Sequence, residues 1–171
     1  MSNINIAYSS GVPITITLTG LPSNGVGYLT TGQTSVSIFN TGTNLYYLDA
    51  FVGGKITVGT SPTDQRQIEI WAYGNIDDVP TYPDVIVGTD AQIIISTMGT
   101  KISSLKLLSV IGTGPTTSQT YWFGPVSVAS VFGGILPKNW GLFVCQNTAV
   151  TLNTTGTQHS ITYTPIYETV I

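Results

Sequence analysis

The residues best suited to nucleophilic catalysis are Cys145 and His159, each the only residue of its type in the chain. A thiol nucleophile needs a neighbouring base, and these two side chains could meet if their strands were adjacent in a sheet. No carboxylate lies near either residue in the sequence to orient the imidazole, and Asn147 and Asn153 are weak substitutes. Cys145 lies in an alternating apolar stretch and His159 in a polar turn. We therefore expect a buried thiol, an exposed imidazole and a protein that is not an enzyme.

Asp77, Asp78 and Asp84 lie within the longest irregular stretch, residues 74–90. Their oxygen atoms could bind Ca²⁺. The stretch lacks the glycine of an EF-hand loop, however, and two prolines interrupt it. We expect a solvated loop, which at this length is either functional or held in place by a partner.

Other arrangements for catalysis or cofactor binding are missing from the sequence. Glu69 and Glu168 are the only glutamates, and nothing places them together as the carboxylate pair of a glycosidase. No group of histidines and cysteines has the spacing of a zinc site, and no glycine-rich loop opens a helix that could hold phosphate. We expect neither a metal nor a cofactor.

Aromatic side chains are the remaining candidates for a binding site. A row of them could stack against sugar rings, and aromatic residues are equally common in interfaces between protein subunits. The candidates are Trp71, Tyr73, Tyr82, Tyr121, Trp122 and Phe123. We predict that Trp71, Tyr73, Tyr82 and Trp122 contact a neighbouring subunit, with a long loop of the chain itself as the alternative contact for Trp71 and Tyr73. Binding to a carbohydrate, for example a host glycan, is the alternative.

The composition is typical of an all-β protein with little surface charge. Only 8% of the 171 residues are charged, compared with about 25% in ordinary soluble domains. The chain has 27 Thr and 19 Gly, which suit half-exposed sheet faces and turns. Such compositions occur in large permanent assemblies and in extracellular sandwich domains. The five scattered cations and the net charge of −3 argue against a nucleic-acid partner.

Alternation of apolar and polar residues predicts roughly eight to ten strands. The clearest example is residues 67–73, where Ile68, Ile70 and Ala72 share one face. The predicted strands cover residues 13–19, 34–39, 45–52, 55–58, 67–73, 91–96, 105–111, 140–146, 149–152 and 160–167. Turns at intervals of about ten residues favour one antiparallel β-sandwich domain over residues 1–171. The length and the lack of a Cys…Trp…Cys pattern favour a jelly roll over an immunoglobulin-like fold.

A few segments depart from alternation. Residues 126–132 have helical spacing and predict one short helix, which Gly133 and Gly134 would end. The pair Gly53-Gly54 predicts a two-residue hairpin turn. Residues 1–12 have no internal pattern, which predicts an irregular N-terminal arm.

The sequence gives no sign of a membrane-spanning segment or of a disulfide. The first residues lack the basic start of a signal peptide, and no apolar run reaches the roughly 20 residues that a spanning helix needs. A single cysteine excludes a disulfide within the chain. We expect synthesis in a cytoplasm and no membrane contact.

Residues 127–144, SVASVFGGILPKNWGLFV, resemble a segment of the small jelly-roll proteins that decorate or cement the capsids of tailed bacteriophages. In that family a short helix ends in Phe-Gly-Gly, a hydrophobic residue precedes proline, and an aromatic-glycine pair opens a strand. The chain's ending, residues 163–171, is similar to the close of such proteins. The resemblance covers the last third of the chain. It departs at residues 147–150, Asn-Thr-Ala-Val, where relatives often have Asn-x-Thr-Gly.

The resemblance implies a non-enzymatic virion protein, made in the cytoplasm of a bacterial host, that binds the major capsid protein on the outside of a phage head. It further implies a homotrimer at three-fold positions of the shell. The segments without an internal pattern, residues 1–12 and 74–90, are the candidates for reaching the shell.

Overall fold

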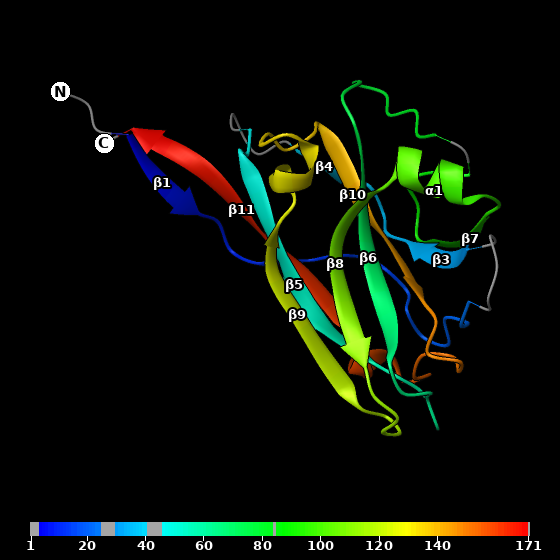
Figure 1. Ribbon diagram of the computed structural model, residues 1–171. Coiled ribbons are helices and arrows are strands. Elements are labelled where there is room, and N and C mark those ends of the chain that lie inside the picture. The colour runs from blue at the N-terminus through cyan, green and yellow to red at the C-terminus, as the bar shows by residue number, and fades with distance from the viewer. Residues whose placement is uncertain (1–3, 25–29, 41–45, 84, 171) are drawn as a thin grey trace.

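The computed structural model describes residues 4–24, 30–40, 46–83 and 85–170 of the chain, and its two antiparallel sheets form a β-sandwich (Figure 1). The first sheet contains, in spatial order, β1 (Ile4–Tyr8), β11 (Ser160–Val170), β5 (Asp49–Thr57) and β9 (Thr120–Ser127), with β2 (Val12–Pro13) also paired to β11. The second contains β7 (Ala91–Ile95), β3 (Thr30–Thr34), β10 (Asn139–Gln146), β6 (Arg66–Asn75) and β8 (Lys106–Thr113), with β4 (Ile38–Phe39) also paired to β10.

The order of pairing makes this sandwich a jelly roll. β1 and β2 lie along β11 as one interrupted strand, and β3 and β4 lie along β10 in the same way. The strands at the two ends of the sequence therefore pair with each other. Moving inward along the sequence from both ends, β3 and β4 pair with β10, then β5 pairs with β9, and finally β6 pairs with β8. A long antiparallel hairpin rolled up in this way is the jelly-roll topology. The predicted fold class is confirmed.

The main core lies between the two sheets and follows the alternation of the strands. Ile68, Ile70 and Ala72 of β6 are fully buried on one face, as the sequence predicts. Val52 and Ile56 of β5 face them from the other sheet and belong to the same apolar cluster.

A second, smaller core covers the outer face of the second sheet. Tyr73, Phe143 and Cys145 point outward from β6 and β10, and Ile95 and Leu105 pack over them. β10 is therefore buried on both faces, which explains its nearly continuous apolar sequence.

The cover of this second core includes a helix that alternation does not predict, α1 (Met98–Ser104). It begins after Thr97, whose hydroxyl oxygen accepts a hydrogen bond from the backbone N–H of Thr100 at 3.1 Å. Seven residues are too few for a clear helical period, so the sequence shows only a connection here.

The helix predicted at residues 126–132 is present in part, as the 3₁₀ helix η1 (Ala129–Phe132), because β9 continues to Ser127. Gly133 and Gly134 follow it with φ of 84° and 94°, the left-handed conformation that ends a helix. A further 3₁₀ turn, η2 (Gly156–Gln158), precedes β11.

The predicted hairpin at Gly53-Gly54 is wrong, because both residues lie inside the continuous strand β5. A side chain at Gly54 would collide with the backbone oxygen of Ser160 on β11. A side chain at Gly53 would crowd the backbone oxygen of Phe123 on β9. Glycine is needed here because two neighbouring strands approach closely, beside an irregularity in the β5–β9 pairing.

Several other boundaries differ from the prediction. No predicted strand covers β9, and the predicted strand 34–39 is in fact the end of β3 followed by β4. The N-terminal arm is not irregular, since residues 4–8 form β1 and pair with residues 166–170 of β11. The ladder of the predicted strand at 13–19 ends at Pro13, although Ile14 and Leu18 are buried as its alternation requires. Residues 149–152 contribute only one isolated bridge, from Leu152 to Val58.

Candidate binding surface at one end of the sandwich

Three connections lie at one end of the sandwich, together with the ribbon made by β1 and the end of β11 (Figure 1). They join β4 to β5, β6 to β7, and β9 to β10. Two of them are the segments that the sequence singles out, the irregular stretch 74–90 and the Phe-Gly-Gly segment. The fold thus brings together two stretches that lie about 50 residues apart in the chain.

Asparagine and aspartate side chains fix these connections to one another. The Asn40 side-chain amide accepts a hydrogen bond from Tyr47 N at 2.8 Å and donates one to Tyr47 O at 2.9 Å. Asn139 Nδ2 donates to the backbone oxygen of Asp77 at 2.7 Å. Asp49 Oδ1 accepts from Ala129 N at 2.8 Å, which anchors the start of η1. This end of the protein is therefore held in a defined shape.

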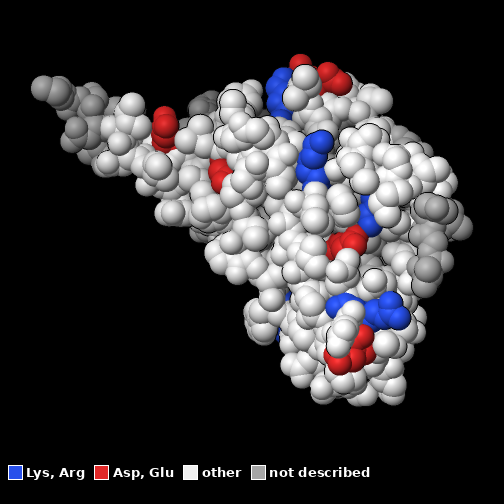
Figure 2. Space-filling model, viewed as in Figure 1, with Lys and Arg blue, Asp and Glu red and all other residues white. Residues whose placement is uncertain are grey.

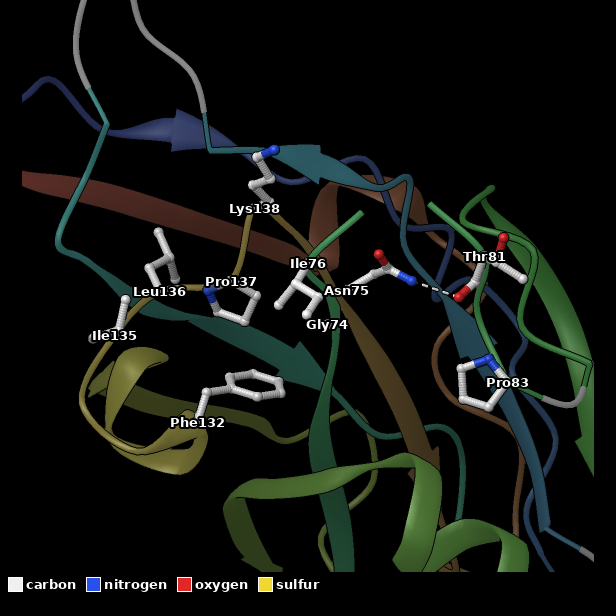
Figure 3. Close-up of a pocket in the computed structure, with 10 residues that line it drawn as sticks. All are labelled: Gly74, Asn75, Ile76, Thr81, Pro83, Phe132, Ile135, Leu136, Pro137 and Lys138. Atoms are coloured by element: carbon white, nitrogen blue, oxygen red, sulfur yellow. Dashed lines mark hydrogen bonds between the residues drawn. The ribbon is translucent and has the colours of Figure 1, made fainter. Parts of the chain in front are cut away.

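A groove of about 530 Å³ runs between the β6 end and the β9–β10 connection (Figure 3). Phe132, Leu136 and Pro137 form one side of it, and Ile76 forms part of the other. Its polar groups are few: Asn75, whose Nδ2 donates to Thr81 O at 2.5 Å, with Thr81 itself and Lys138 at the rim. The lining of the groove is therefore mixed, more apolar than polar, with Lys138 as its charged side chain.

Large apolar side chains are exposed around this groove. Ile76, Val79 and Ile135 have 81%, 82% and 74% of their surface exposed. We call the following six exposed residues the apolar end: Phe39, Tyr46, Leu48, Ile76, Val79 and Ile135. Lys138 pairs with Asp78 beside them, and this contact raises the pKa of Lys138 above its ordinary value. The apolar end is thus a hydrophobic surface, and the charges of Lys138 and Asp78 beside it neutralise each other.

The opposite end of the sandwich has a different character. Its connections join β2 to β3, β5 to β6, β8 to β9 and β10 to β11. Among the described residues of these connections, no large apolar side chain is exposed. Scattered exposed hydrophobic residues are ordinary on any protein, whereas a concentration at one end marks a contact surface.

The β1–β11 ribbon extends away from the sandwich, next to the apolar end (Figures 1 and 2). Within the described residues, β1 is paired on one side only, to β11. Ile4, Ile6 and Tyr8 lie on one face of it, and each is more than 60% exposed. Charged side chains are few and scattered over the visible face of the molecule (Figure 2).

None of the predicted interface residues Trp71, Tyr73 and Tyr82 lies in the apolar end. Tyr82 lies in the long loop, Tyr73 packs against it, and Trp71 lies beside Lys101 of α1. Tyr73 is fully buried, and its ring packs edge-on against Tyr82 at 5.0 Å between centroids. Trp71 is half-buried, with Lys101 Nζ 4.6 Å from the centre of its ring. These three residues contact the chain itself.

Trp122 is the exception, since 73% of its surface is exposed, on β9 of the first sheet. The interface roles of Trp71, Tyr82 and Trp122 stay predictions, whereas the fully buried Tyr73 has no surface to offer a neighbouring subunit. The six candidate aromatic residues are divided among β6, β9 and the long loop, and Phe123 and Tyr73 are buried, so they do not form one stacking platform. The sequence pattern assigns Phe39 to the predicted strand 34–39, and Tyr46 and Leu48 to the predicted strand 45–52, so their exposure was not expected. Ile76, Val79 and Ile135 lie in connections, where no periodic pattern identifies exposed residues.

The acidic loop does not assemble a metal site in the described residues. Asp78 pairs with Lys138, and Asp84 lies outside the described residues. Across the described ranges, no group of three or more His, Cys, Asp or Glu side chains could hold a metal ion. No helix in the described part of the chain is long and apolar enough to cross a membrane.

Cys145 and His159 do not meet. His159 Nε2 lies 2.8 Å from the backbone oxygen of Asn153, and Nδ1 accepts a weak hydrogen bond from Thr57 N at 3.4 Å. The imidazole is half-buried rather than exposed as predicted, because it packs into the turn before β11. Cys145 is buried as predicted, on the outer face of the second sheet, beside Lys101.

We expect the thiol of Cys145 to be inert to alkylating reagents in the folded protein. Burial raises its pKa to about 12, so the thiolate that would react is almost absent at neutral pH. Incubation with iodoacetamide should leave the native chain unmodified and should label the freshly reduced chain fully in denaturant. Rapid labelling of the native chain would contradict the burial of this residue.

Acidification is expected to destabilise the fold in two steps. Burial lowers the pKa of His159 below 6.5, so the folded state resists protonation and stability is lost as the pH falls from about 6.5 towards the folded pKa. Burial acts to raise the pKa of Glu69, but hydrogen bonds from Lys101 and Trp71 outweigh it and hold the pKa below 4.5. A second loss of folding stability therefore starts below about pH 4.5. Urea unfolding across this pH range should show both steps, and His159→Gln should remove only the first.

No family model and no curated protein matches the chain. Two solved structures align with this chain over almost its whole length. The VP1 protein of Trichodysplasia spinulosa-associated polyomavirus has 8% identity over 98% of this chain and 95% of its own, with a TM-score of 0.33. The unassembled VP1 pentamer of KI polyomavirus has 8% identity over 99% and 95%, with a TM-score of 0.26. At these values neither likeness assigns a family or a function to the chain.

Proposed function

We propose that this chain is a non-enzymatic structural protein of a virion, which attaches through its apolar end to the outer surface of a phage capsid and stabilises the shell. The observation that carries the proposal is the concentration of exposed, large apolar side chains at one end of the jelly roll, with none exposed in the described connections of the other end. The resemblance of residues 127–144 to capsid decoration proteins supports the same function, and part of that segment lines the groove.

The mechanism of stabilisation is thermodynamic linkage. A subunit that bridges neighbouring capsomers binds the assembled shell and not the separated capsomers, so its binding free energy favours the intact state. Contacts made by apolar side chains depend weakly on salt, unlike contacts between exposed charges. The low charge of the chain, 8% of its residues, suits an attachment that persists over a wide range of ionic strength.

The proposal includes a homotrimer at three-fold positions, which rests on the resemblance. Light scattering of the purified protein would then give a mass of three times 18.1 kDa. A monomeric mass would contradict the trimer. It would not contradict the attachment to the shell, which the binding experiment tests.

The binding experiment uses empty shells assembled from the major capsid protein of the same genome. The chain should sediment with the shells, saturate at a fixed ratio to the capsid subunits, and stay bound when the salt concentration is raised. Shells carrying the protein should also disassemble at a higher temperature than bare shells. Failure to sediment with the shells would overturn the proposed function.

A further inference from the structure

Three reactive side chains meet on the outer face of the second sheet. They are Lys101 of α1, Cys145 of β10 and Glu69 of β6. Glu69 Oε2 lies 2.5 Å from Lys101 Nζ and 3.4 Å from Cys145 Sγ, and Nζ lies 3.6 Å from Sγ. Lys101 and Cys145 are only 4% and 2% exposed. An amine, a thiol and a carboxylate are thus held in mutual contact and almost out of reach of water.

The neighbours of this cluster act on the carboxylate. Trp71 Nε1 donates to Glu69 Oε2 at 2.9 Å, and Gln67 Nε2 donates to Oε1 at 2.7 Å. These hydrogen bonds keep Glu69 ionised, so its carboxyl carbon is a poor electrophile for Lys101. Glu69 is instead placed to accept a proton from either of its two partners. The reactive contact that remains is the one between nitrogen and sulfur.

A purely structural explanation accounts poorly for this arrangement. A buried ion pair contributes little net stability compared with apolar residues of similar size, because both charges lose their hydration. The thiol adds only a weak hydrogen bond. The chain has a single cysteine, so this thiol cannot form a disulfide within the subunit, and the partner that the fold supplies at contact distance is an amine.

We propose that Lys101 and Cys145 are a cross-linking site, at which molecular oxygen produces a covalent bridge from Nζ through one oxygen atom to Sγ. The S–H bond and one N–H bond break, and an S–O and an O–N bond form. Dioxygen accepts four electrons in total: one of its atoms becomes the bridge, and the other leaves as water with the two hydrogens. Glu69 accepts the additional proton of the ammonium group. A bridging oxygen spans the existing gap with less movement than a direct S–N bond.

The bridge would join α1 to the central strand of the second sheet. Lys101 and Cys145 lie 44 residues apart, so the cross-link closes a long loop and restricts the unfolded chain. Its formation is independent of the proposed attachment to a shell, because all three groups belong to one subunit.

Intact mass spectrometry of the protein before and after incubation in oxygenated buffer tests the proposal. The bridged chain should be heavier by about 14 Da, one oxygen gained and two hydrogens lost, and a thiol reductant should restore the original mass. Peptide mapping should join the peptides of Lys101 and Cys145. Cys145→Ser and Lys101→Arg should each prevent the change.

Other masses would overturn the proposal. Gains of about 16, 32 or 48 Da confined to Cys145 would mark ordinary oxidation of the thiol, and a loss of about 18 Da would mark an amide between Lys101 and Glu69. An unchanged mass after prolonged oxidation would also overturn it. The decisive measurement uses the unaltered protein, so it does not depend on whether either variant folds.

Discussion

Replacing Ile135 with aspartate is expected to weaken binding to assembled shells by at least about 30-fold, which corresponds to the roughly 2 kcal/mol of a central interface residue. Ile135 is 74% exposed in the free subunit and lines the groove of the apolar end. An aspartate there keeps its hydration in the free protein and must lose it in an apolar contact. The free energy of unfolding should change little, because the side chain is exposed in the folded subunit.

Trp122→Asp is the matched control for this prediction. Trp122 is 73% exposed, close to the value for Ile135, but it lies on β9 in the first sheet and away from the groove. Because Trp122 is also a predicted subunit contact, light scattering must first show that the mass of this variant in solution is unchanged. Quantitative sedimentation with shells should then give an unchanged affinity. If Trp122→Asp abolishes binding and Ile135→Asp does not, the attachment surface is the face of the first sheet.

Replacing Glu69 with alanine is expected to destabilise the protein by about 3–5 kcal/mol, because it leaves Lys101 buried without its counter-ion. The Lys101 side chain is 6% exposed and that of Glu69 is 20% exposed, so water compensates for little of the loss. Urea unfolding, followed by tryptophan fluorescence, would measure the change, since Trp71 lies directly against the ion pair. Lys101→Met combined with Glu69→Gln should recover most of the stability, because no unpaired charge then remains buried.

The exposed ion pair between Asp78 and Lys138 provides the comparison. The Asp78 side chain is 88% exposed, so Asp78→Ala should leave the unfolding midpoint unchanged within error. Equal effects of Glu69→Ala and Asp78→Ala would show that the buried cluster does not hold α1 against the sheet.

Much of the fold can be predicted from the sequence because the strands alternate. The face of β6 formed by Ile68, Ile70 and Ala72 is fully buried, and the apolar run of β10 is buried on both faces, as each pattern requires. The alternation of apolar and polar residues predicts which face of a strand is buried in a core. It holds even at Ile14 and Leu18, which lie beyond the end of β2.

The remaining features depend on contacts between distant parts of the chain. Gly54 has the sequence signature of a turn, yet its role is set by Ser160, more than 100 residues away, which leaves no room for a side chain. Glu69, Lys101 and Cys145 belong to three separate elements, so no spacing within one stretch of the sequence predicts that they lie together. Of the binding surface, the sequence identifies the two unusual segments, residues 74–90 and 127–144, but only the jelly-roll connections place them side by side.

Hydrogen–deuterium exchange of the protein, free and bound to shells of the major capsid protein, tests the attachment surface most directly. Binding should slow exchange in residues 46–48, 74–79 and 132–138 at the apolar end, and should leave residues 58–65 and 114–119 at the opposite end unchanged. Protection confined to that opposite end, or to β9 on the face of the first sheet, would contradict attachment through the apolar end.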